Sequence, residues 1–230
     1  MKTFSLGLLL ITVTLLVPVI AAEPPTGSVA LVSKVILDVS RKESDKTWQT
    51  AKRGETLSTG DKVKTGEKSL AVIKFKDNSL VRVRERSELT VTGEVNRGAF
   101  SKSVNMEKGV VGFNIKKQQT DEEFRFTSPT SVASIRGTGG QFTSSAAADT
   151  LTVIEGLVRL TNKLSSEFVD VGAGFTGISN PNGSVEARPA TPEEQQAALE
   201  ASKISDQENR LEFEFRDGQG NRKMLKIEYK

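Results

Sequence analysis

Histidine and cysteine, which supply most catalytic nucleophile–base pairs and most zinc ligands, are both absent from this 230-residue chain. Their absence excludes Ser-His-Asp and Cys-His catalytic sets, as well as zinc sites built on thiolate or imidazole. A Ser-Lys pair needs neither residue, but the sequence contains no Ser-x-x-Lys spacing. The sequence therefore predicts a protein that is not an enzyme and that uses no cofactor or metal.

Two glycine-containing runs look superficially like nucleotide-binding loops. In residues 65–69, Glu67 separates the glycine from the lysine, and a strand pattern follows instead of the required helix. Residues 137–140 lack the full Gly-x-Gly-x-x-Gly spacing and are not followed by a helix pattern. The acid pairs at 122–123 and 193–194 are adjacent in sequence, whereas glycosidase acids must face each other across a cleft. We interpret these segments as β-corners, turns and solvated surface.

Arg136 is the charged residue most closely joined to an apolar run, because it directly follows residues 132–135. Buried charges must be paired, so we expect its guanidinium to be partly buried and tied to carbonyls or an acid at a corner. Together with Gly137 and Thr138, it could instead contact an anion or a sugar carboxylate. Trp48, the only tryptophan, is expected in the core, with a stacking surface for a sugar ring as the alternative.

Four sequence motifs occur in a recognisable order. Gly60-Asp61-Lys62-Val63-Lys64-Thr65 leads into a strand and turn, and Ile135-Arg136-Gly137-Thr138 ends the run that begins at Ser128-Pro129. Val153-Ile154-Glu155-Gly156-Leu157-Val158 and Val171-Gly172-Ala173-Gly174 follow. Together they resemble the FecR-type domain over roughly residues 27–183.

The resemblance implies a domain outside the inner membrane. In sigma-regulator members, this domain is linked to a cytoplasmic segment that binds a sigma factor. The only long apolar run here is N-terminal, so we expect no such cytoplasmic part.

Short apolar segments separated by turn residues extend from Val29 onward, which is typical of many short strands. Glycines recur beside these segments, where tight corners need unusual backbone angles. We predict an all-β, solenoid-like domain of short strands with glycine corners, in which Ala71, Ile73, Val132 and Ile135 are among the core residues. A β-sandwich is the alternative.

Residues 1–22 have a positive start, an apolar stretch and small residues before Glu23, which is the pattern of a secretory signal peptide. We expect cleavage and a periplasmic or secreted protein without a membrane span, an uncleaved anchor being the alternative. Without cysteine, the exported fold would depend on packing and backbone hydrogen bonds. A formal net charge of +3 with scattered basic residues predicts no nucleic-acid binding.

The composition changes after residue 183, and we divide the chain into a domain at 27–186 and a C-terminal appendage at 187–230. Thr191 as N-cap and Pro192 as first helical residue predict a helix to about Lys203. A β-hairpin follows, and an isolated hairpin is marginal in water, so its apolar residues should dock internally or on a partner. These residues are Leu211, Phe213, Phe215, Leu225, Ile227 and Tyr229.

The function that these observations favour is binding or scaffolding in the cell envelope by an exported, non-catalytic protein. The partner would be an envelope protein or a glycan, and the oligomeric state is open. One alternative is an extracytoplasmic signalling component that contacts a membrane regulator or receptor by strand pairing. A second alternative is a polysaccharide-binding protein, although one Trp and one Tyr provide few aromatic platforms.

Overall fold

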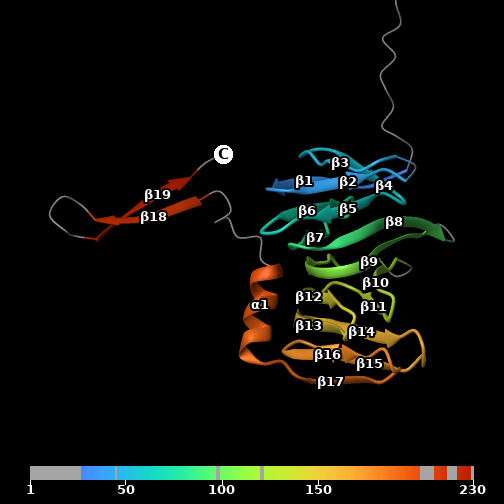
Figure 1. Cartoon of the computed structure of the whole chain (residues 1–230). Coiled ribbons are helices and arrows are strands. Elements are labelled where there is room, and N and C mark those ends of the chain that lie inside the picture. Colours follow the sequence, from blue (N-terminus) through green and yellow to red (C-terminus); the bar gives the residue numbers. More distant parts are fainter. Residues whose placement is uncertain are drawn as a thin grey trace, which may run out of the picture.

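The computed structural model describes residues 27–44, 46–96, 99–119, 122–202, 210–216 and 222–228. It confirms a fold of many short strands with one helix and a C-terminal hairpin (Figure 1). The expected signal peptide, residues 1–22, lies outside the described residues. The elements are β1 (Ser28–Ile36), β2 (Val39–Lys42), β3 (Gln49–Thr50), β4 (Thr56–Ser58), β5 (Lys62–Thr65), β6 (Leu70–Phe75), β7 (Leu80–Val83), β8 (Glu88–Asn96), β9 (Ala99–Asn114), β10 (Phe124–Thr127), β11 (Ser131–Ile135), β12 (Gly139–Ser144), β13 (Asp149–Glu155), β14 (Leu157–Asn162), β15 (Phe168–Gly172), β16 (Phe175–Ser179), β17 (Val185–Pro189), α1 (Pro192–Ser202), β18 (Arg210–Arg216) and β19 (Arg222–Glu228).

The first 17 strands form a stack with two faces, and the core lies between them (Figure 1). Face A contains, in spatial order, β4, β1, β6, β7, the end of β9, β12, β13, β16 and β17. Face B contains β3, β2, β5, β8, the start of β9, β10, β11, β14 and β15. From β6 onward the chain places two strand segments on one face and then crosses to the other, except that the end of β9 is a single segment on face A. The pairs within both faces are antiparallel, apart from the parallel pair of β9 and β10.

The long strand β9 changes face at Gly109. Its residues before this point pair with β8 and β10, and Gly109 to Asn114 pair with β12. Gly109 has a φ of 111°, and a Cβ there would lie 2.5 Å from the Cα of Ser87. Glycine is thus required both by the backbone angle and by the close approach of the neighbouring corner.

Inward-pointing Val, Ile, Leu and Phe side chains fill the space between the faces, as the period-two alternation of strand side chains predicts. Ala71, Ile73 and Ile135 are fully buried, which confirms their expected place in the core. Val132 is only partly buried and points outward from β11, so its expected core position is wrong. Aromatic rings run through the centre, with ring centroids 4.9 Å apart for Phe75 and Phe124.

Helix α1 begins as the sequence predicts. The amide of Glu194 donates to the Thr191 hydroxyl at 3.3 Å, and the Glu194 carboxylate accepts from the Thr191 amide at 2.8 Å. This reciprocal pair is a capping box, which satisfies two donors that the first helical turn leaves open. The helix contacts β7, β9, β12 and β13, and so covers part of the outer surface of face A (Figure 1).

The C-terminal hairpin forms at the expected place in the sequence. Strand β18 pairs with β19 so that Leu211 is opposite Ile227 and Phe213 is opposite Leu225. Phe215 is paired with Lys223, and Tyr229 lies outside the described residues. Docking of this hairpin onto the domain or onto a partner stays a prediction.

Candidate functional site

Arg136 does not have the environment expected from the sequence, because its side chain is exposed at the end of β11. The apolar run before it does not bury the guanidinium, since Ile135 points inward and the next residue of a strand points outward. The charge of Arg136 nevertheless helps to lower the pKa of the neighbouring Glu123. Burial raises the pKa of Glu123, but hydrogen bonds from Arg125 and Ser134 and the charges of Arg125 and Arg136 outweigh this and leave it lowered.

Gly137 and Thr138 form a packed corner with a second motif. A Cβ on Gly156 would lie 2.9 Å from both the Gly137 carbonyl oxygen and the Thr138 Oγ1. Thr138 exchanges backbone hydrogen bonds with Ile115, and its hydroxyl donates to the Leu157 carbonyl at 3.3 Å. The Arg-Gly-Thr and Glu-Gly segments therefore meet because both glycines allow close backbone approach, which is a structural role.

A polar pocket of about 310 Å³ opens beside this corner. Gly137 and Thr138 line it together with Lys116, Lys117 and Glu155. The two lysines are exposed, and Arg136 does not line the pocket. Only part of the predicted Arg136-Gly137-Thr138 set is thus brought to one cavity.

Trp48 is not part of the core, which corrects the expectation of core packing. Its side chain is partly exposed just before β3, and the Lys64 ammonium lies 4.3 Å from the centre of the ring. This distance is typical of a cation–π contact. The tryptophan therefore packs against a lysine on the outer surface of face B.

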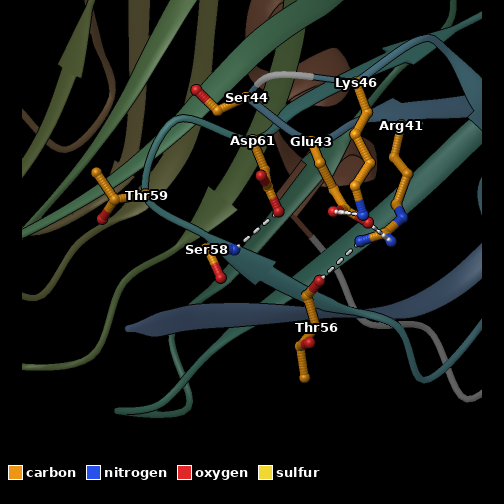
Figure 2. Close-up of a pocket in the computed structure, with 8 residues that line it drawn as sticks. All are labelled: Arg41, Glu43, Ser44, Lys46, Thr56, Ser58, Thr59 and Asp61. Carbon is orange, nitrogen blue, oxygen red and sulfur yellow. Dashed lines mark hydrogen bonds and ion pairs between the residues drawn. The ribbon is translucent and has the colours of Figure 1, made fainter. Parts of the chain in front are cut away.

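A second polar pocket, of about 360 Å³, lies between the β2–β3 loop and the β4–β5 turn (Figure 2). We call it the β4–β5 pocket. Hydroxyl and charged side chains supply its lining throughout. The lining residues are Arg41, Glu43, Ser44, Lys46, Thr56, Ser58, Thr59 and Asp61.

An ion-pair network fixes one wall of the β4–β5 pocket. The Arg41 guanidinium donates to Glu43 at 2.6 Å and to the Thr56 carbonyl at 3.0 Å, and its Nε lies 3.1 Å from a Glu55 oxygen. Lys46 lies 2.5 Å from the second oxygen of Glu43. The hydrogen bond from Lys46, together with the charges of Lys46 and Arg41, holds the pKa of Glu43 below its usual value. Glu43 is therefore a carboxylate at neutral pH, with its charge neutralised locally.

Asp61 forms the floor of the pocket and is only 5% exposed. Its Oδ2 accepts from the Ser58 amide at 2.9 Å, which closes the β4–β5 turn. Gly60 next to it has a φ of 92°, and a Cβ there would lie 3.3 Å from the Ser44 hydroxyl. Gly60 is thus needed for the turn, and Asp61 both closes the turn and lines the pocket (Figure 2).

The β4–β5 pocket offers hydrogen-bond donors and acceptors at close quarters. The Ser44 and Ser58 hydroxyls can do both, the Asp61 carboxylate accepts, and the Lys46 ammonium donates. No imidazole or thiolate stands beside a nucleophile, since the chain has neither residue. Among the residues that the structure describes, no cluster of three or more acidic side chains could hold a metal. The arrangement can bind a polar ligand.

Sequence reasoning missed this pocket because its lining comes from two turns without a recognisable motif, apart from Gly60-Asp61. It also missed Arg82, whose side chain is 2% exposed. In β7, Arg82 lies on the outer side of face A, opposite to the buried Val81 and Val83, and α1 covers that position. The Arg82 Nη1 donates to the Ser202 carbonyl at 2.7 Å. The burial of Arg82 depends on α1, which lies far away in the sequence, so the pattern of β7 alone could not reveal it.

Within the described part of the chain, no helix is long and apolar enough to cross a membrane. Comparison with curated proteins gives no match. Two crystal structures described as a "putative anti-sigma factor" from Parabacteroides distasonis are 13% identical to this chain with a TM-score of 0.49. The matches cover 66% and 69% of this chain, and 66% and 70% of those chains.

The model of the family described as FecR protein matches residues 61–159. The matched segment begins at Asp61 in the floor of the β4–β5 pocket and ends in β14. It contains the second and third motifs, with the corner formed by Gly137, Thr138 and Gly156, and all of the first motif except Gly60. The resemblance drawn over residues 27–183 is therefore confirmed for residues 61–159, where this chain carries a FecR-type domain.

Proposed function

We propose that this protein is an exported, non-catalytic binding protein of the cell envelope, and that its β4–β5 pocket holds a hydroxylated ligand such as an envelope glycan. The observation that carries the proposal is the pocket lining, where two serine hydroxyls and a nearly buried carboxylate lie around one cavity. Sugar hydroxyls both donate and accept, so they match a surface that presents both functions. The FecR-type domain and the signal-like N-terminus support an envelope location.

The charges of the pocket favour a neutral or weakly charged ligand. Arg41 is occupied by Glu43, Glu55 and the Thr56 carbonyl, so it has little capacity left for a bound anion. Lys46 is paired with Glu43. Asp61 would repel a carboxylate or phosphate placed directly against it. A saccharide hydroxyl that donates to Asp61 fits better.

The test is calorimetric titration of the full chain with neutral and anionic oligosaccharides prepared from envelope polysaccharide. Ser44→Tyr should abolish binding, because Ser44 is exposed at the rim and a tyrosine there fills the cavity. Ala147→Tyr places the same side chain on the exposed β12–β13 turn and should bind like wild type. Equal binding by both variants would contradict the proposed site.

A second candidate function is signalling through contact with a membrane regulator or receptor, which the FecR-type domain favours. Strand β15 ends face B and is paired on one side, with β14. An open edge of this kind can accept a strand from a partner. Replacing Asp170 by proline removes a backbone donor on the open side of this strand, because the ladder directs the amides of Val169 and Val171 toward β14. Loss of a regulator's co-purification in that variant, with the oligosaccharide titration unchanged, would favour signalling.

A further inference from the structure

A buried lysine bridges the two faces of the stack at one end of the core. Lys102 occupies an inward position of β9 on face B, and its side chain is 2% exposed. Its Nζ lies 2.9 Å from Oδ2 of Asp77, which belongs to the β6–β7 turn of face A. A second carboxylate, Glu122, has its Oε2 3.8 Å from the same nitrogen. One amine and two acids therefore meet at the edge of a hydrophobic core.

The carboxyl group of Asp77 is held by several hydrogen-bond donors. Gln118 Nε2 and the Ser79 hydroxyl donate to Oδ2 at 2.9 Å each, and the Ser79 amide donates to Oδ1 at 2.9 Å. Burial raises the pKa of Asp77, but the hydrogen bonds from Lys102, Gln118 and Ser79 overcome this and leave it lowered. The resting state of the pair is thus an ammonium beside a carboxylate. Donors fixed on a carboxyl group also stabilise negative charge that develops there when a nucleophile attacks.

Apolar side chains around Lys102 make the charged state of the Lys102–Asp77 pair less favourable. The Phe100 ring centre lies 5.7 Å from the Lys102 Nζ, and Phe124 is the ladder partner of Lys102 in β10. Phe124 in turn packs edge-on against Phe75, two residues before Asp77. Because the Lys102 side chain is almost fully buried, proton transfer from its ammonium to the partly buried Asp77 carboxylate removes a charge from the apolar end of the core. The products are a neutral amine and a carboxylic acid in contact.

We propose that Lys102 and Asp77 condense to an intramolecular amide that covalently joins faces A and B, with Glu122 as the proton shuttle. The Lys102 Nζ, after giving one proton to Asp77, attacks Cγ and forms the new nitrogen–carbon bond. Glu122 accepts a second proton from the nitrogen and delivers it to the departing hydroxyl. The carbon–oxygen bond breaks, one water leaves, and Glu122 is again a carboxylate. No oxidant or other co-reactant is required.

Such a bond would give a cysteine-free protein a covalent link between its two faces. Lys102 and Asp77 are 25 residues apart in sequence, so the amide would close a loop that contains β7, β8 and the start of β9. Closing a loop of this kind restricts the unfolded chain much as a disulfide does. The proposal does not depend on the ligand of the β4–β5 pocket.

Peptide mapping of the purified full chain by mass spectrometry tests the proposal directly. Trypsin should leave residues 77–82 joined to residues 98–108, at the sum of the two peptide masses less one water. Cleavage after Lys102 should not occur, because an acylated lysine is no longer a substrate. Separate peptides of full mass, with normal cleavage after Lys102, would show an ordinary ion pair and overturn the proposal.

Two variants identify the roles of the residues. Lys102→Arg keeps the positive charge near Asp77 but replaces the amine by a guanidinium that stays protonated and cannot form the amide. The two peptides should therefore be found separately, and the melting temperature should fall. Glu122→Gln should also yield mostly separate peptides, because the shuttle is lost. A fully joined product in Glu122→Gln would overturn the assignment of Glu122. Mapping of the wild-type chain decides the central point even where a variant fails to fold.

Discussion

The Arg82 guanidinium on β7 donates a 2.7 Å hydrogen bond to the carbonyl of Ser202, 120 residues later at the end of α1. The last carbonyls of a helix have no partner within the helix and carry partial negative charge. A buried cation at this point therefore satisfies one carbonyl and interacts favourably with the helix dipole. The contact attaches the C-terminal helix to the FecR-type domain.

Replacing Arg82 by leucine should lower the free energy of unfolding by about 1.5–3 kcal/mol, the usual contribution of a hydrogen bond to a charged group. The Ser202 carbonyl would lose this donor at a residue that is only 9% exposed. Chemical denaturation provides the measurement. Arg84→Leu is the matched control, because Arg84 follows β7 directly and is exposed. An equal decrease of the unfolding free energy in both variants would show that the Arg82 hydrogen bond contributes no more to stability than an exposed arginine does.

Gly112→Ala should displace the end of α1. A Cβ at Gly112 would lie 1.9 Å from the carbonyl oxygen of Ala201, so the helix or the strand must move. Overpacking of this kind typically costs about 1–3 kcal/mol. Hydrogen exchange should become faster in α1 while the core strands keep their protection. Gly139→Ala is the control, because its nearest neighbour would be 3.8 Å from the new Cβ, and unchanged exchange in Gly112→Ala would contradict the prediction.

Much of this arrangement follows from local sequence signals. Ala71 and Ile73, which the strand pattern placed in the core, are fully buried, and Thr191-Pro192 marked the start of α1. These predictions succeed because alternation and capping depend on near neighbours in the sequence.

The failures concern environments that distant segments create. Arg136 was expected to be partly buried and is exposed, whereas Arg82 is buried under a helix that begins 110 positions later in the numbering. Trp48 was expected in the core, yet it packs against Lys64 on the surface. The β4–β5 pocket requires two turns to come together. None of these contacts is encoded within a short window, so patterns within one strand could not indicate them.

The corner between the two family motifs makes a further prediction. Gly156 and Gly174 have similar backbone angles, with φ of 88° and 80°, so alanine strains both positions, by about 1–2 kcal/mol. A Cβ at Gly156 additionally meets the Gly137 carbonyl at 2.9 Å, whereas no atom lies within 4 Å of one at Gly174. Gly156→Ala should therefore lower the melting temperature clearly more than Gly174→Ala. Equal shifts would mean that the close approach of the two motifs has no energetic importance.

Glu194 should make the stability depend on acidic pH. The hydrogen bond from Arg188 lowers the pKa of Glu194, and hydrogen bonds from the Thr191 amide and the Thr176 hydroxyl lower it further. Burial acts in the opposite direction, and the resulting pKa in the folded protein is about 2. An unfolded glutamate titrates near pH 4.3, so this stabilisation is complete above that pH and is lost as the pH falls toward about 2. Glu194→Gln should flatten the decrease in unfolding free energy over this range. Glu200→Gln, at an exposed position of α1, should retain the wild-type slope, and parallel curves for Glu194→Gln and wild type would contradict the assignment.

The binding proposal is tested most directly by residue-resolved amide shifts in an NMR titration with a neutral oligosaccharide from envelope polysaccharide. The account predicts saturable shifts that are centred on Ser44, Ser58 and Asp61 in the β4–β5 pocket, and a ligand that is recovered chemically unchanged. Shifts centred on Gly137 and Thr138, the absence of saturable shifts, or conversion of the oligosaccharide to a new product would contradict it.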